Sequence, residues 1–527
     1  MTGTLALLRL ALRRDRILLP AWILGLAAMV SISVSATKDL YPTEALRIGA
    51  SSAINATAAL VGLYGRIYDP TSIGALSLIK MTAFGAALVA IVFVFVVVRH
   101  TRTEEESGRL ELLSAGVVGR SAPLAAGLLA GIGGSAALGL LTALGLVGVG
   151  LPISGSIAFG LSWMLSGAVF SAIAAVAAQV TTSHRSAVGI SVAVIGLSYV
   201  LRAVGDLAAN GPSFLSWLSP IGWSQQLRPF AGNRWVVVTL PLLLTGLLIP
   251  LAFALRARRD LGAGLIPDRP GPDRGVLGST RALAWRVQRS TVIAWLVGCM
   301  ALGGILGSAA HNVTGLLVSP QMQKYIQLLG GTQGLIKAFL AAEIAIMASV
   351  IAAFAISATL RLRSDEVSGY SELLLAASTS RIRLAMNGFA IAVFGSAAVL
   401  LGTGIAIGLA NGLASGDPIG QTGALLAAAA VQVPAIWVMA SITLALFGWV
   451  PRATNAAWAT LVAFVIVGEF GPLWKLPQWV LDLSPFAHSP RLPGGSVSAL
   501  PLIGLTAVAV ALAAVGLLGW TRRDLQP

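Results

Sequence analysis

Apolar residues run through this chain in long stretches, and most polar residues are gathered between them. A helix that crosses the hydrocarbon core of a bilayer needs about 20 predominantly apolar residues. Twelve stretches approach or exceed this length, and the fifth and eleventh are the shortest. They predict twelve membrane-spanning helices, at residues 17–36, 75–98, 122–149, 157–180, 187–204, 236–255, 291–310, 338–360, 384–410, 422–449, 456–470 and 500–520.

Two of the polar segments carry the same pattern. The first follows the second stretch and reads RTEEESGRLELLSA over residues 102–115; the second follows the eighth and reads RSDEVSGYSELLLA over residues 363–376. We refer to both as charged segments. Their arginine, acidic pair, Ser-Gly, Glu-Leu-Leu and final alanine match at a constant offset, 261 residues from Gly108 to Gly369. Similarity at fixed spacing indicates internal repetition, so two related halves are predicted.

The ends of the sixth and twelfth stretches support this division, because residues 258–261 and 522–525 both read RRDL. We expect a first half over residues 1–256, a linker over 257–285 and a second half over 286–527. The linker includes a run rich in Gly, Pro, Asp and Arg, from Ala263 to Ser279, which is typical of a flexible connection. Six spans per half give both halves the same orientation, so the repeat is predicted to be parallel.

Composition agrees with a polytopic, all-α membrane protein. Hydrophobic residues make up 56% of the chain and charged residues only 10%, against roughly 25% charged in soluble domains. A net charge of +15 would suggest nucleic acid as the partner of a soluble protein. Here we interpret it as topology and predict no nucleic-acid partner. Lys and Arg concentrate in alternate segments, and the positive-inside rule then places both termini in the cytoplasm.

The sequence shows no sign of an enzyme. It contains no GxxxxGK[ST] phosphate-binding loop, and none of its lysines follows a glycine. One cysteine, Cys299, and four scattered histidines predict neither a disulfide nor a metal site. We therefore expect no catalytic, cofactor-binding or metal-binding residue, and any energy from ATP must come from another subunit.

The charged segments are the strongest functional signal. In the first, Leu110, Leu113 and Val117 follow a helical spacing that predicts one apolar stripe on a polar helix. A solvated loop that only reverses the chain would not need identical spacing in two otherwise divergent halves. We favour docking, in which the apolar stripe enters a groove of a soluble partner and the carboxylates meet its basic groups.

This pattern, E-x-S-G-x-x-E-L-L after the second span of each six-span half, resembles the ABC-2 type permeases. The closest resemblance is to fused twelve-span forms such as bacterial polyketide-antibiotic (tetronasin-type) and multidrug export permeases, and it covers nearly the whole chain. It implies a multi-pass permease subunit in a bacterial cell membrane. Two copies of a separate ATP-binding subunit, holding ATP and Mg²⁺, would dock on the charged segments as coupling helices. The implied docking residues are Arg102, Glu104, Glu105, Gly108, Glu111, Leu112, Arg363, Asp365, Glu366, Gly369, Glu372 and Leu373.

The same resemblance implies export of hydrophobic or amphipathic compounds by alternating access, as in antibiotic and multidrug efflux. A cavity would be lined by the second and fifth spans of each half, with Lys80, Phe84, Glu343 and Phe354 as candidate residues. Glu343 is an acid well inside a predicted span, where a carboxylate is costly and commonly functional. A contact with substrate and a structural hydrogen bond to a neighbouring helix are equally compatible with its position.

The alternative is an ion-coupled secondary transporter with twelve spans. Such a protein is expected to carry several acids or histidines within its spans as proton relays. Only Glu343 lies well inside a predicted lining span, so we favour the ATP-driven exporter. The residues do not identify the substrate.

Overall fold

The computed structural model of the chain describes residues 2–56, 58–114, 116–206, 212–266, 278–310, 331–377, 379–470, 477–495 and 498–525. Across these ranges the regular structure is helical, and no strand occurs within them. The chain divides into two compact units, Met1–Pro270 and Gly271–Pro527. This division lies inside the linker predicted at residues 257–285, and each unit is described by itself below.

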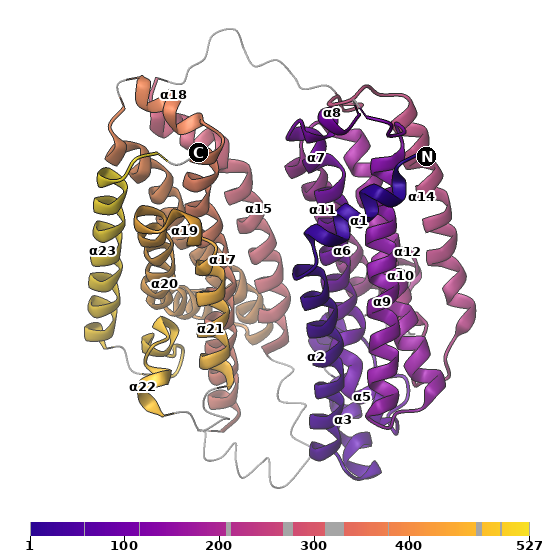
Figure 1. Cartoon of the computed structure of the whole chain (residues 1–527). Helices are drawn as coiled ribbons and strands as arrows, with labels where there is room; N and C mark the ends of the chain where they lie inside the picture. Colours follow the sequence, from indigo (N-terminus) through magenta and orange to yellow (C-terminus); the bar gives the residue numbers. More distant parts are fainter. Residues whose placement is uncertain are drawn as a thin grey trace. The chain divides into compact units, whose positions relative to one another are not determined.

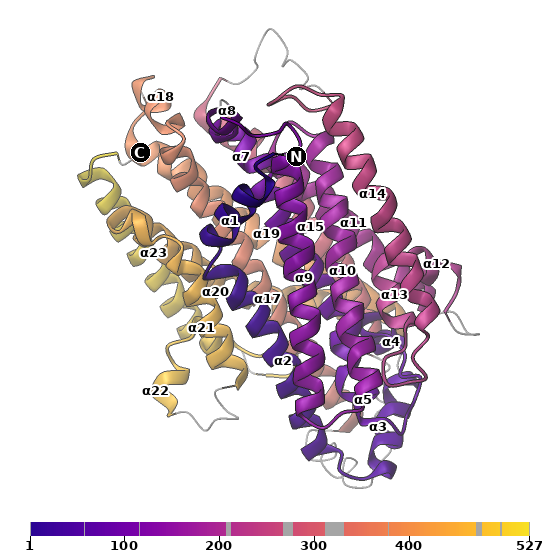
Figure 2. The same cartoon turned by 45° about the vertical axis from the view of Figure 1, so that its right-hand side comes forward.

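The first unit is a bundle of long helices with short helices at both ends. The charged segment (α7 and α8) and the N terminus lie at one end of this bundle, whereas α3 and α5 lie at the other (Figures 1 and 2). Its helices are α1 (Thr4–Arg14), α2 (Leu18–Leu40), α3 (Glu44–Ala56), α4 (Ala58–Tyr64), α5 (Ile73–Lys80), a π-helical turn (Met81–Gly85), α6 (Ala86–His100), α7 (Arg102–Glu106), α8 (Arg109–Ser114), α9 (Ala122–Gly148), α10 (Ile153–Val180), α11 (His184–Asp206), α12 (Phe214–Leu218), α13 (Pro220–Gln226), a 3₁₀ turn (Trp235–Val238) and α14 (Thr239–Ala257).

The second unit is also a bundle of long helices, with fewer short helices among its described residues. The charged segment, here the end of α17 together with α18, lies at the same end of the unit as the C terminus, and α22 lies at the opposite end (Figure 1). Its helices are α15 (Thr280–Ala309), α17 (Gly331–Val367), α18 (Tyr370–Ala376), α19 (Arg381–Ser415), α20 (Pro418–Trp449), a 3₁₀ turn (Pro451–Ala453), α21 (Ala456–Phe470), α22 (Gln478–Leu481), a second 3₁₀ turn (Pro485–His488) and α23 (Ala499–Arg522).

Eleven helical stretches of the described chain are long and apolar enough to cross a membrane. They correspond to eleven of the twelve predicted spans. The exception is the eleventh, predicted at 456–470, where α21 has these same bounds and only 15 residues. That length is shorter than the about 20 residues a straight crossing requires. The structure therefore confirms an all-helical chain with many apolar spans, and α21 falls short of the length criterion.

One helix forms the centre of each unit. In the first unit α10 packs against α6, α9, α11 and α14, and in the second α20 packs against α17, α19 and α23. Small residues let the backbones approach, as is usual where no hydrophobic force drives helices together in lipid. A β-carbon built on Gly139 of α9 would lie 2.5 Å from the Gly160 carbonyl oxygen of α10. A side chain at either glycine would push these helices apart.

Part of the predicted linker belongs to the first unit. The backbone N–H groups of Leu265 and Ile266 donate to the carbonyls of Gln179 and Val180 at the end of α10, at 3.2 and 3.0 Å. The prediction of a flexible connection from Ala263 was therefore wrong for residues 263–266, because these backbone groups find partners on the bundle. Residues 267–277 of the linker lie outside the described residues, and its last residues, 280–285, form the start of α15, so this helix begins earlier than the predicted second half.

Candidate functional site

The Ser-Gly pair of each charged segment is explained by its backbone. In the first unit, α7 ends at Glu106 and α8 begins at Arg109, and Gly108 between them has φ of 71°. Gly369 has φ of 75° and begins α18 in the second unit. Only glycine adopts this left-handed conformation at little cost. Both glycines were assigned to docking, and the structure shows that they turn the chain between successive helices: α7 and α8 in the first unit, and α17 and α18 in the second.

The first acid of interest, Glu105, is buried among arginines of its own chain. Its two carboxylate oxygens accept hydrogen bonds from the two Nη groups of Arg259, both at 2.7 Å. Arg102 donates to the same carboxylate at 2.9 Å, and the backbone N–H of Gly262 donates at 2.9 Å. The Glu105 side chain is 3% exposed and that of Arg259 is 4% exposed. No other molecule can reach this carboxylate without opening the site.

The second unit builds the same arrangement. Glu366 accepts from the two Nη groups of Arg523 at 2.6 and 2.8 Å, and from Arg363 at 3.0 Å. Its side chain is 1% exposed. Bidentate pairing of a guanidinium with a carboxylate is among the strongest polar contacts in proteins. We call the pairs Glu105–Arg259 and Glu366–Arg523 the anchors.

The sequence analysis noted the two RRDL tetrapeptides but gave their arginines no role, and these arginines form half of each anchor. Arg259 and Arg523 are the second arginines of the two RRDL tetrapeptides, so the repeated ends of the last spans pair with the repeated acids of the charged segments. A third matched arginine joins them: Arg120 donates to the carbonyl of Arg259, and Arg381 donates to that of Arg523. Matching tetrapeptides at matching places were the signal that could have suggested this pairing.

All three nitrogens of the Arg102 guanidinium donate hydrogen bonds within the first unit. Its guanidinium donates to the carbonyls of Thr182, Ala263 and Gly262 at 2.9, 3.1 and 3.0 Å, in addition to Glu105. It thereby joins α7 to the turn between α10 and α11 and to the segment after α14. Arg102 is 1% exposed. Its contacts therefore fix the charged segment to the rest of the unit, and its side chain is not on the surface where another subunit could touch it.

Two further acids of the predicted docking set, Glu104 and Asp365, also pair within their own unit. Arg14 of α1 pairs with Glu104, whose side chain is 16% exposed. In the second unit, Asp365 accepts from Arg361 one helical turn earlier, at 2.8 Å. These contacts lie at the rim of the anchors and keep some solvent exposure.

Two residues at the end of each charged segment remain on the surface. Leu112 is 80% exposed and Leu373 is 70% exposed, and the preceding Glu111 and Glu372 are exposed as well. We call each Glu-Leu pair a tip. The predicted apolar stripe is corrected here, because Leu110 is buried and lines a small hollow with Leu7 and Leu10 of α1. Val117 is exposed, and the side chain of Leu113 is outside the described residues.

The four candidate substrate residues lie two in each unit, Lys80 and Phe84 in the first and Glu343 and Phe354 in the second. Lys80 is exposed, with its ammonium group 5.5 Å from the centroid of the Tyr64 ring, and Phe84 is 46% exposed. Phe354 is buried against Trp295, with ring centroids 5.8 Å apart, and therefore acts as core packing in its unit. Glu343 is 6% exposed, and neither of its carboxylate oxygens has a hydrogen-bond partner among the described residues. The structural hydrogen bond considered for Glu343 is thus not seen in the described chain.

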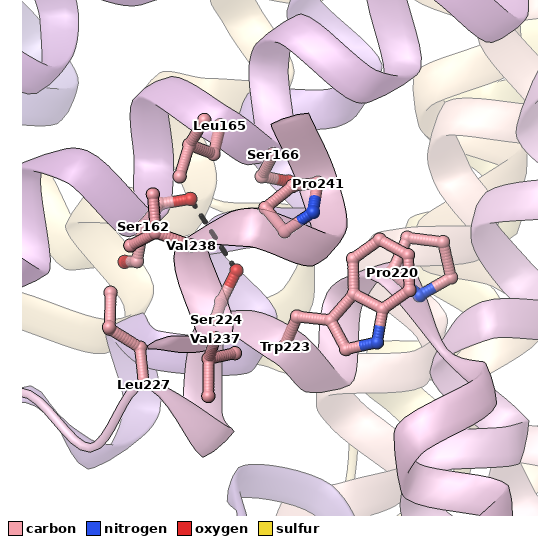
Figure 3. A pocket seen from close by; sticks show the side chains of 10 residues that line it. All are labelled: Ser162, Leu165, Ser166, Pro220, Trp223, Ser224, Leu227, Val237, Val238 and Pro241. Carbon is pink, nitrogen blue, oxygen red and sulfur yellow. Dashed lines mark hydrogen bonds between the residues drawn. The ribbon is translucent and has the colours of Figure 1, made fainter. Parts of the chain in front are cut away.

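A small hollow lies beside α10 in the first unit, where α13 and the start of α14 pack against it (Figure 3). Trp223 and Pro220 border it, and the Ser224 hydroxyl donates to the Ser162 carbonyl across it at 3.5 Å. Its volume of about 10 Å³ suffices for no more than one water molecule. It is a packing defect and cannot accept a drug-sized compound.

The sequence of this chain is similar to those of known proteins. The family described as "Multidrug efflux system permease Rv1217c, C-terminal domain" matches residues 6–255 and 277–521, which is nearly the whole of both units. The chain belongs to this family. A relative from Mycobacterium tuberculosis (strain ATCC 25618 / H37Rv), the multidrug efflux system permease protein Rv1217c, is 42% identical over 529 aligned residues. The alignment covers 100% of this chain and 96% of the relative. Membership of this efflux permease family agrees with the many apolar helices and with the assignment of a permease.

Proposed function

We propose that this chain is the membrane permease subunit of an ATP-driven ABC-2 type exporter in a bacterial cell membrane. Its cargo would be hydrophobic or amphipathic compounds, such as antibiotics and other drugs. Membership of a multidrug efflux permease family supports the cargo class and the outward direction. The observation that carries the link to ATP is the charged segment, which presents an exposed Glu-Leu tip on a buried, ion-paired base in both units.

In the mechanism that we propose, the tips are the docking sites for the ATP-binding subunits. One ATP-binding subunit docks on the tip of each unit, with ATP and Mg²⁺ held by those subunits. When the two subunits close on ATP, they displace the charged segments, the units rock, and a cavity opens to the outside. This scheme requires twelve spans, with the short α21 crossing together with flanking residues, and it requires both termini and both tips in the cytoplasm.

The tips provide the decisive test. Replacing Leu112 and Leu373 by Glu removes an apolar contact at each tip and adds a charge, with no loss of internal packing because both side chains are exposed. We expect the variant to insert and fold normally but to co-purify with the ATP-binding subunit at least about tenfold less well, as for the loss of an interface hot spot. Leu413→Glu is the matched control, because Leu413 is 75% exposed at the far end of α19.

Topology tests the same proposal independently. Cys299 is the only cysteine in the sequence, so a cysteine placed at Leu112 in a Cys299→Ser background can be labelled selectively. A membrane-impermeant maleimide should label it in inside-out vesicles and not in intact cells. Labelling in intact cells would refute docking on a cytoplasmic motor. Efflux of a fluorescent dye by liposomes that contain the permease alone, driven by an ion gradient, would instead establish the secondary transporter.

Glu343 is tested by removing its charge. Glu343 is buried and has no hydrogen-bond partner in the described part of the chain. Such a carboxylate is expensive to keep, which supports a role in cargo binding. We expect Glu343→Gln to lower efflux of cationic dyes at least about fivefold while leaving efflux of neutral compounds within about twofold, the pattern of a lost charge contact. Unchanged efflux of every compound would remove Glu343 from the cargo path.

A further inference from the structure

Each anchor connects two places that are far apart in the chain. Glu105 and Arg259 are separated by 154 residues, and Glu366 and Arg523 by 157. The acid belongs to the charged segment, which directly follows the second span of its unit. The arginine lies at the end of the last span, two residues after α14 ends in the first unit and one residue after α23 ends in the second.

Each charged segment is also rigidly attached to the second span. In the first unit α6 ends at His100 and α7 begins at Arg102, so a single residue separates them. In the second unit one helix, α17, continues from the span through Glu366 to Val367. A displacement of the segment is therefore delivered to the second span through the backbone and to the last span through the anchor.

The anchors recur although other contacts of the two segments differ. Glu106 accepts from the backbone and the ring of His184 at the start of α11 in the first unit, at 2.8 and 2.6 Å, whereas Val367 takes its place in the second. Arg102 reaches Thr182, and Arg259 reaches Gln179, in the first unit. Both units retain the bidentate pair between the acid and the second arginine of RRDL, together with the matched arginines that contact this pair.

We propose that Arg259 and Arg523 are positioning residues of the transport cycle, which join the last span of each unit to its charged segment so that the two move as one body. This inference rests on the proposed function, because the displacement comes from the docked ATP-binding subunits. The arginines touch neither cargo nor nucleotide. They act by making the last span follow the second span, so that a pull on one tip moves two helices.

The physical link is tested first on the purified permease alone, by hydrogen exchange. Arg523→Gln removes the charge and the bidentate contact, and Arg523→Lys keeps the charge with a single contact. We expect amide exchange in residues 363–376 to accelerate at least about tenfold in Arg523→Gln, and by less in Arg523→Lys, since local opening follows the loss of the buried pair. Arg361→Gln is the matched control, because it breaks a partly exposed pair with Asp365 inside one helix. Exchange unchanged within about twofold in Arg523→Gln would overturn the anchor.

The functional link is tested in liposomes that contain the permease and its ATP-binding subunit, with a fluorescent hydrophobic dye as cargo. For Arg259→Gln and Arg523→Gln we expect ATP hydrolysis to continue while the dye moved per ATP falls about tenfold, because the motor then moves one span instead of two. Arg523→Lys should recover a large part of this ratio. An unchanged ratio, together with faster exchange, would make the anchors merely structural. If the native permease recruits no ATP-binding subunit, the proposed function fails while the exchange result still decides whether the anchor exists.

Discussion

The charged ends of the two units share one acid and three arginines and differ in what surrounds them. In the first unit Arg259 donates to the side chain of Gln179 at 2.9 Å. In the second, the Arg523 guanidinium lies over the rings of Phe447 and Trp520, 5.0 and 4.7 Å from their centroids. Both arginines keep the bidentate pair with their acid; beside that pair, the first is supported by a side-chain amide and the second by aromatic rings.

The contrast extends to one matched position. Counted from RRDL, Arg256 of the first unit corresponds to Trp520 of the second. Arg256 is 5% exposed, and its Nη1 has no hydrogen-bond partner among the described residues. Trp520 is 1% exposed, and its indole N–H donates to the carbonyl of Arg381 at 2.9 Å. At this matched position the first unit therefore has a buried guanidinium with an unpaired Nη1 among the described residues, whereas the second has an indole whose N–H is hydrogen-bonded. The comparison teaches that the ion pair is the common requirement and that its surroundings can be polar or aromatic.

The largest effects are expected at the acids themselves. Glu105→Ala should destabilise the first unit by about 3–5 kcal/mol, because it leaves the buried Arg102 and Arg259 without a counter-charge. Glu366→Ala should cost less, since Arg363 and Arg523 are 18% and 12% exposed and Arg523 keeps its ring contacts. Thermal unfolding in one detergent compares the two variants. Equal losses would mean that the aromatic surroundings make no difference.

Next come the matched residues Trp520 and Arg256. Trp520→Ala should cost about 3 kcal/mol, through a cavity under Arg523 and the loss of a large buried ring. Arg256→Met should be neutral or stabilising by about 1 kcal/mol, because it removes a buried guanidinium whose Nη1 has no hydrogen-bond partner among the described residues, and it keeps much of the side-chain volume. Both are read as shifts of the unfolding temperature. A marked loss of stability in Arg256→Met would show that its charge is compensated by a group outside the described residues.

Where the units agree, the expected effects should be equal. Gly108→Ala and Gly369→Ala each place a β-carbon on a residue with positive φ, and a β-carbon at either glycine meets open space. Each should therefore cost only the backbone strain, about 1 kcal/mol. The measurement is again the unfolding temperature, together with retention of the ATP-binding subunit. A difference larger than about 1 kcal/mol between them would indicate that the two turns are not equivalent.

The smallest effect is expected when one residue of the first unit is replaced by its counterpart from the second. Glu106→Val introduces the residue found at 367 and removes the contact with His184. The two side chains are 40% and 38% exposed, so water screens the pair and the loss should be at most about 1 kcal/mol. Dye efflux should stay within about twofold of the native protein, since the second unit works without this contact. A strong loss of efflux would instead make the tie to α11 part of the mechanism.

The spans were largely predictable, because a continuous apolar stretch of sufficient length has few alternatives to a membrane helix. The eleventh span was predicted at residues 456–470, and α21 has the same bounds, so its short length could already be seen in the sequence. The linker, in contrast, was misjudged at residues 263–266. Composition indicates flexibility, but the hydrogen bonds of Leu265 and Ile266 to α10 depend on the folded bundle.

The charged segments were recognised from their repetition. The sequence did not show which of their residues are buried and which are exposed. Glu105 and Glu111 are both acids in one polar stretch, and only the fold shows that one is buried and the other exposed. The partner of Glu105 lies 154 residues away, so no local pattern contains the pair. Leu110 was assigned to a partner-facing stripe for the same reason, because its actual neighbours are on α1. The docking role of the tips and the cargo role of Glu343 stay predictions.

The hydrogen bonds of residues 262–266 with the first unit have a practical consequence for protein engineering. Everything that completes the first anchor, including the N–H of Gly262 and the pairing of Leu265 and Ile266 with the end of α10, is finished before residue 267. A protease site inserted between 267 and 277 should therefore yield two separate polypeptides, each retaining its own anchor. Recovery of dye efflux by the two co-expressed fragments would then show that the covalent connection between the halves is dispensable once each has folded.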